Sequence, residues 1–169
     1  MKRFLAAAAL LSTLTVSTLA LSACGFTPLY GQQGVTGGLG AIEVVAADGR
    51  AGYLLREQLE DALARNPNVL ASHRLTYKVE EKRYARGVRV DNVANRYELN
   101  MKVEWKLTDT TTGSEVRKGT TTAVVTYDSA DQPYAAIAAQ QDGQERAAVE
   151  VARKIQLELA SWLAGKAPA

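Results

Sequence analysis

Length, composition and charge limit the functions open to this chain. It has 169 residues, with 20 Lys and Arg against 18 Asp and Glu, one histidine and one cysteine. This size favours one small domain, and the balanced charge is not that of a nucleic-acid binder. One thiol and one imidazole exclude an internal disulfide and a zinc site built from a His/Cys cluster, and we expect no metal and no cofactor.

Residues 1–23 have the pattern of a bacterial secretion signal. Lys2 and Arg3 form a basic start, residues 4–20 are almost wholly apolar or small, and small residues precede Cys24. The phrase Leu21-Ser22-Ala23-Cys24 resembles the lipobox of bacterial lipoproteins, in which diacylglycerol is attached to the cysteine and the signal is cut before it. We expect a cleaved signal peptide over 1–23 and lipidation of Cys24. The alternatives are an uncleaved membrane-spanning anchor and an ordinary buried cysteine.

The mature chain divides into a lipidated tether and one domain. Residues 24–40 are rich in glycine and predict a tether, although Phe26, Leu29 and Tyr30 are apolar enough to pack against something. A short strand is expected over 41–46. A helix follows over about 50–65, where apolar residues recur at helical spacing until Asn66-Pro67 ends it.

The clearest pattern is strict alternation over 93–108, which predicts a long antiparallel strand with one wet face. The strand before it covers about 74–90, and a shift of its apolar phase predicts a bulge near Glu81–Arg83. The strand after it covers about 115–127, beyond a turn at 109–114. These three strands should form a meander.

A long C-terminal helix begins near Pro133 and carries an apolar stripe from Ala148 to Leu163, with Gly143 as the place where it would break or kink. The order βαβββα predicts an α+β fold over residues 41–165. We expect a two-layer sandwich with a four-stranded mixed sheet and both helices on one face. The polar face of the sheet would then be open to water or to a partner.

Residues with catalytic potential are few. His73, the only histidine, reads as a surface or structural residue, and we expect no enzyme. Positive charge is concentrated between Arg74 and Lys118, with 11 basic and 7 acidic residues. If the first hairpin turns near Asp91–Asn92, several arginines gather at its tip, and Lys102 and Lys106 continue along the polar face. The planar guanidinium group of arginine can donate two parallel hydrogen bonds to the oxygens of a phosphate group. Charges that protect strand edges from aggregation are an equally good interpretation.

The segment Cys24-Gly25-Phe26-Thr27-Pro28-Leu29-Tyr30-Gly31 resembles the start of LptE, the lipopolysaccharide-assembly lipoprotein, in its alphaproteobacterial form. The resemblance implies a lipid anchor in the outer membrane, facing the periplasm and the lumen of a β-barrel. It implies a plug inside the LptD barrel that helps the barrel fold and helps insert lipopolysaccharide into the outer leaflet.

Binding of lipopolysaccharide is also implied by the resemblance, through basic residues of the sheet and loops. Charge position makes the candidates Arg83, Arg86, Arg89, Arg96 and Lys102. The alternative function is a lipid-anchored periplasmic scaffold that binds another envelope protein or peptidoglycan.

Overall fold

The computed structural model describes residues 29, 34–88 and 94–165. The expected signal peptide, Cys24, Arg89 and the expected turn at Asp91–Asn92 lie outside these residues. The described elements are α2 (Val35–Gly40), β1 (Ile42–Val45), α3 (Gly49–Ala62), β2 (His73–Val88), β3 (Ala94–Asp109), β4 (Glu115–Asp128) and α4 (Pro133–Ala164).

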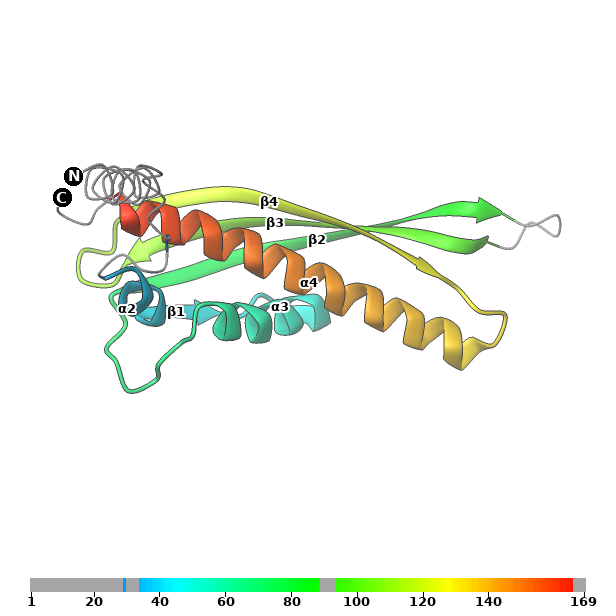
Figure 1. Ribbon diagram of the computed structural model, residues 1–169, viewed down its shortest axis with the longest axis horizontal. Coiled ribbons are helices and arrows are strands. Elements are labelled where there is room, and N and C mark those ends of the chain that lie inside the picture. Colours follow the sequence, from blue (N-terminus) through cyan, green and yellow to red (C-terminus); the bar gives the residue numbers. More distant parts are fainter. Residues whose placement is uncertain (1–28, 30–33, 89–93, 166–169) are drawn as a thin grey trace, which may run out of the picture.

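The four strands form one mixed sheet in the order β1-β2-β3-β4 (Figure 1). β1 runs parallel to β2, with Val44 opposite Leu75, and α3 supplies the crossover that a parallel pair needs. β2, β3 and β4 are joined as antiparallel hairpins. The predicted α+β class and four-stranded mixed sheet are confirmed.

Both long helices cover one face of this sheet. α4 packs across β3 and β4, α3 packs on β1 and β2, and the two helices contact each other (Figure 1). The alternation of β3 explains the layering, because Met101, Val103, Trp105 and Leu107 all point into the core and are fully buried. α4 meets them with an apolar stripe that includes Val151, Ile155 and Leu159. The predicted two-layer sandwich is therefore confirmed.

The bulge predicted near Glu81–Arg83 is wrong. Pairing of β2 with β3 is regular from His73 to Ala85, and its irregularities lie between Ala85 and Val88. The phase shift in the sequence has another cause. Glu81 and Arg83 occupy helix-facing positions, where Gln144 and Gln140 of α4 bond to them and replace apolar packing.

The last helix does not break at Gly143. α4 is continuous from Pro133 to Ala164, and Gly143 is buried inside it. A Cβ atom at this position would lie 2.9 Å from Cδ1 of Tyr127. The glycine therefore allows close approach of α4 to β4 and does not end the helix.

The tether predicted over 24–40 is too long at its C-terminal end. Val35–Gly40 form α2, in which Val35 and Leu39 are buried in the common core. Leu29 also packs against the core, as its apolar character indicated. The folded unit therefore includes residues that the sequence assigned to a linker.

Candidate functional site

The outer sheet face, defined as the side of β2, β3 and β4 that points away from the helices, is rich in polar and charged side chains. Residues that face each other across adjacent strands share one side of a sheet. The cross-strand rows on the outer sheet face are Lys78–Glu104–Thr120, Glu80–Lys102–Thr122 and Tyr84–Glu98–Thr126. This face carries charges of both signs in close alternation.

Two hollows lie on the outer sheet face. The larger has a volume of about 640 Å³, and its lining includes Lys78, Glu104, Lys106 and Lys118. The smaller has a volume of about 270 Å³ and is lined by Glu80, Lys82, Tyr84, Asn100, Lys102 and Thr122. Lysine ammonium groups are point charges that bind phosphate and carboxylate groups, so these hollows suit an anionic ligand.

Lys102 belongs to the smaller hollow and is paired within its own strand. Its Nζ donates a hydrogen bond to Glu104 Oε1 over 2.7 Å. This bond raises the pKa of Lys102 and lowers the pKa of Glu104, so both groups are charged at neutral pH. An anionic ligand would therefore compete with Glu104 for the ammonium group.

The end of the sheet near the β2–β3 hairpin carries two forked ion pairs. Arg86 donates from Nε and Nη2 to Glu98 over 3.0 and 2.8 Å. Arg96 donates from Nε and Nη2 to Asp128 over 2.7 and 3.3 Å. These bonds lower the pKa values of Glu98 and Asp128. Both pairs are open to solvent, and surface ion pairs of this kind contribute little to stability, so each opens easily to a competing anion.

Arg83 lies on the opposite side of the sheet from these pairs. Its Nη1 donates to Gln140 Oε1 of α4 over 2.6 Å, and its guanidinium carbon lies 4.8 Å from the centre of the Tyr97 ring. The predicted basic residues are therefore divided by the sheet. Arg86, Arg96 and Lys102 lie on the outer sheet face, Arg83 lies under α4, and Arg89 is outside the described residues.

Lys78 and Lys118 are part of the larger hollow, and charge position alone did not single them out. The alternation of polar and apolar residues does indicate the face of Lys78. Lys78 is at a polar position of β2, just as Lys102 and Lys106 are at polar positions of β3. Finding the site needs the strand register that places Lys106 opposite Thr76 and Lys118. That register follows from pairing across the sheet and not from any one strand.

His73 lies at the other end of β2, beside Ser72 and opposite Asp109. Ser72 Oγ and His73 Nδ1 are 2.8 Å apart, a distance at which a serine can be activated. Asp109, however, accepts hydrogen bonds from the backbone N–H groups of Thr111 and Thr112, which lower its pKa. The His73 ring packs edge-on against Trp162 at 5.3 Å. These contacts give the cluster a structural role at the end of the sheet.

Among residues 34–88 and 94–165, no helix is both long and apolar enough to cross a membrane. Over the same residues, no group of three or more His, Cys, Asp or Glu side chains is placed to hold a metal ion.

These features define a class: a small two-layer α+β domain whose charged and hollowed sheet face is open to a partner. The family follows from comparison with known sequences. The model of the LptE family, described as lipopolysaccharide-assembly, matches residues 39–159. The chain therefore belongs to the LptE family, which confirms the family that the resemblance at Cys24–Gly31 indicated.

Solved structures include similar lipoproteins. A protein from Caulobacter crescentus CB15, described as a candidate lipoprotein, is 68% identical, with a TM-score of 0.72 over 80% of this chain and 99% of its own. The rare lipoprotein B from Shewanella oneidensis is 16% identical, with a TM-score of 0.45 over 74% and 94%. A minor lipoprotein from Acinetobacter baumannii is 14% identical, with a TM-score of 0.48 over 71% and 90%. The comparison with curated proteins gave no match.

Proposed function

We propose that this protein is an outer-membrane lipoprotein that plugs an LptD-type β-barrel, helps to assemble it and assists lipopolysaccharide insertion. The observation that carries the proposal is the family match over residues 39–159, which extends from α2 to near the end of α4. In this role the protein binds and positions other molecules and catalyses no reaction. Its anchor is a diacylglycerol group on Cys24, attached after removal of residues 1–23.

The surface of the domain supports a plug. The lumen of an outer-membrane barrel is polar, so a plug needs a polar exterior with charges of both signs. Exposed ion pairs such as Arg86–Glu98, Arg96–Asp128 and Lys102–Glu104 give this domain such an exterior. The domain is also elongated, because β2, β3 and α4 all run along its long axis (Figure 1).

Lipopolysaccharide is the proposed ligand of the outer sheet face. Its phosphates and acidic sugars need concentrated positive charge, and the hollows on this face bring lysines of three strands together. Among the candidate residues, Arg86, Arg96 and Lys102 lie on this face. Arg83 lies on the helix side of the sheet, and Arg89, which is outside the described residues, stays a candidate from the sequence alone.

Photocrosslinking in intact cells tests the proposal. An aromatic crosslinking amino acid at Lys106, on the outer sheet face, should capture one large outer-membrane barrel protein. The matched control is Trp105, the preceding residue, because its large side chain is buried in the core and an aromatic crosslinker there should capture nothing. Capture of a different envelope protein or of peptidoglycan at Lys106 would instead support the scaffold function.

Mass spectrometry tests the anchor separately. The mass of the purified mature protein should include diacylglycerol on Cys24 and should lack residues 1–23. An unmodified Cys24 in the mature protein would contradict the anchor.

A further inference from the structure

The α3–β2 loop, residues 63–72, carries an apolar tip that points into solvent. Leu70 is 94% exposed and its neighbour Val69 is 43% exposed. Single exposed apolar residues are common on protein surfaces and by themselves need no explanation. Two further observations distinguish this tip. Hydrogen bonds hold the loop at both ends, and the loop is bonded to the segment through which the chain enters the fold.

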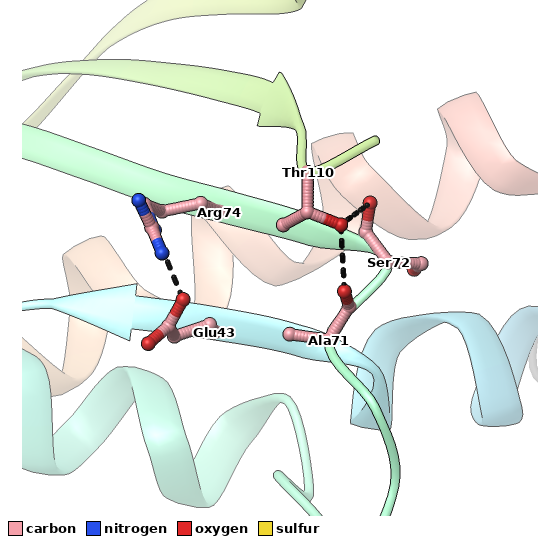
Figure 2. Close-up of polar contacts among 5 residues, drawn as sticks. All are labelled: Glu43, Ala71, Ser72, Arg74 and Thr110. Carbon is pink, nitrogen blue, oxygen red and sulfur yellow. Dashed lines mark hydrogen bonds and ion pairs between the residues drawn. The ribbon is translucent and has the colours of Figure 1, made fainter. Parts of the chain in front are cut away.

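Hydrogen bonds at both ends hold the loop in place. Arg65 Nη1 donates to the carbonyl oxygens of Gly40 and Val69 over 2.9 and 3.3 Å, and the Asn66 N–H donates to Gly40 O over 3.1 Å. At the other end, Thr110 Oγ1 contacts the carbonyl oxygens of Ala71 and Ser72 at 2.7 and 3.0 Å (Figure 2). The exposure of Leu70 is therefore built into a loop that is bonded at both ends.

The same loop is joined to the segment through which the anchor reaches the domain. Gly40, its bonding partner, is the last residue of α2, and Gly38 of α2 packs against Leu163 at the C-terminal end of α4. Leu29, which packs against the core, is only five residues after Cys24. Five extended residues span at most about 18 Å.

Because the domain is long, this short connection determines which end of the domain lies near the bilayer. α4 has 32 residues and is therefore about 48 Å long. Leu29 is also only five residues before Gly34, the N-cap of α2, so it lies near that end of the domain. A lipid on Cys24 reaches far less than the length of α4 from Leu29, so the α2 end of the domain is the end held near the bilayer. The α3–β2 loop lies at that end, and α4 begins at the far end (Figure 1).

The charge around the loop also suits a lipid surface. From Ala62 to Arg74 the sequence contains Arg65 and Arg74 and no acidic residue, while Asp61 precedes this stretch and Asp109 lies opposite His73. Glu43 of β1 approaches this region, but Arg74 Nε donates to its carboxylate over 2.9 Å (Figure 2). Anionic headgroups would therefore meet no unpaired carboxylate in this stretch of chain.

We propose that the α3–β2 loop is a second membrane contact, in which Leu70 and Val69 enter the headgroup region beside the lipid anchor. The inference rests on the lipid anchor of the proposed function. Acyl chains on Cys24 anchor the protein to the bilayer, and the loop sets the orientation of the domain relative to the bilayer. The α2 end of the domain then lies at the membrane surface, and the start of α4 lies at the opposite end of the domain (Figure 1).

Collisional quenching tests this contact on the full-length lipidated protein. Because lipidation consumes the Cys24 thiol, Leu70→Cys introduces the only free thiol, which can carry a nitrobenzoxadiazole fluorophore. Tyr134→Cys is the matched control, since Tyr134 is 90% exposed near the start of α4. The vesicles contain phosphatidylethanolamine and phosphatidylglycerol, with a spin-labelled lipid as quencher.

We expect the probe at residue 70 to shift to the blue and to be quenched several-fold more than the probe at residue 134. Equal quenching at both positions, or none at residue 70 in protein that floats with the vesicles, would overturn the loop contact and leave the anchor intact. Protein that does not float would overturn the anchor and the loop contact together. If a probe at residue 70 changes only after a barrel protein is added, the tip binds protein and the lipid proposal is wrong.

Discussion

Tyr77 joins the sheet to α3 through a buried hydroxyl group, and this makes stability depend on alkaline pH. The side chain is 7% exposed, and its hydroxyl donates a hydrogen bond to the Gly52 carbonyl oxygen over 2.7 Å. Burial raises the pKa of Tyr77 from 10.0 to about 12. Below pH 10 the phenol is protonated in both the folded and the unfolded chain. Between pH 10 and 12 only the unfolded chain loses the proton, so stability falls as pH rises.

The free energy of unfolding should fall by about 2 kcal/mol across this interval, at about 1.4 kcal/mol per pKa unit. Urea unfolding at pH 9 and at pH 11.5 measures the change. Lysines also titrate in this range, so the control is Tyr77→Phe, which removes the phenol and keeps the ring. The variant should be less stable at pH 9 but lose less stability on going to pH 11.5. Equal losses for the two proteins would show that Tyr77 does not cause the decline.

At the residue scale, the sequence predicts which face a side chain occupies only where one pattern continues. The alternation of β3 assigns Met101, Val103 and Trp105 to the core, and the structure agrees. In β2 the inward positions after Val79 hold Glu81 and Arg83. Their partners, Gln144 and Gln140, follow 63 and 57 residues later in the chain. Only the tertiary fold brings such pairs together. In the sequence alone, charged residues at these inward positions of β2 cannot be told from a shift of the apolar alternation by one residue.

At the scale of elements, contact between α4 and β4 predicts the effect of Gly143→Ala. Alanine favours a helix over glycine by about 1 kcal/mol. Here its Cβ would lie 2.9 Å from the Tyr127 ring, which is itself stacked on Tyr97 at 5.7 Å between ring centres. Overpacking of this kind costs about 1–3 kcal/mol, so we expect a net loss of stability of about 1 kcal/mol. Thermal unfolding measures it.

Gly37→Ala is the matched control for this substitution. Gly37 is also in a helix, but no atom lies within 4 Å of the place where its Cβ would be. Only the gain in helix propensity then operates, and the variant should be as stable as the parent or slightly more stable. If Gly143→Ala also stabilised the protein, the close approach of α4 to β4 would not limit this position.

The elements themselves were largely predictable because their signals are local. The order of strands and long helices follows from periodicity, and the parallel pairing of β1 follows from the crossover rule. α2 was not predictable, because three of its six residues are glycines, which disfavour helices. Its formation depends on packing, since a Cβ at Gly38 would lie 3.0 Å from Leu163.

On the scale of the whole molecule, the sheet separates two surfaces that a one-dimensional charge count merges. The excess of positive charge between Arg74 and Lys118 is visible in the sequence. Its division between the outer sheet face and the space under α4 is hidden there, because Glu81 and Arg83 interrupt the apolar alternation that would assign each residue of β2 to a face. Arg83 and Arg86 are three residues apart in the chain and lie on opposite sides of the sheet.

This separation predicts which charges matter for lipopolysaccharide. Reversing Arg86 and Lys102 together to Glu places new carboxylates beside Glu98 and Glu104 on the outer sheet face. Lipopolysaccharide binding should weaken by roughly tenfold or more, equivalent to about 1.4 kcal/mol, and the remaining binding should weaken further with salt. Arg50→Glu with Arg153→Glu is the control, because it makes the same change in net charge on exposed positions of α3 and α4. Circular dichroism should be normal for both double variants. Equal loss of binding in the two would mean that net charge, and not the outer sheet face, attracts the ligand.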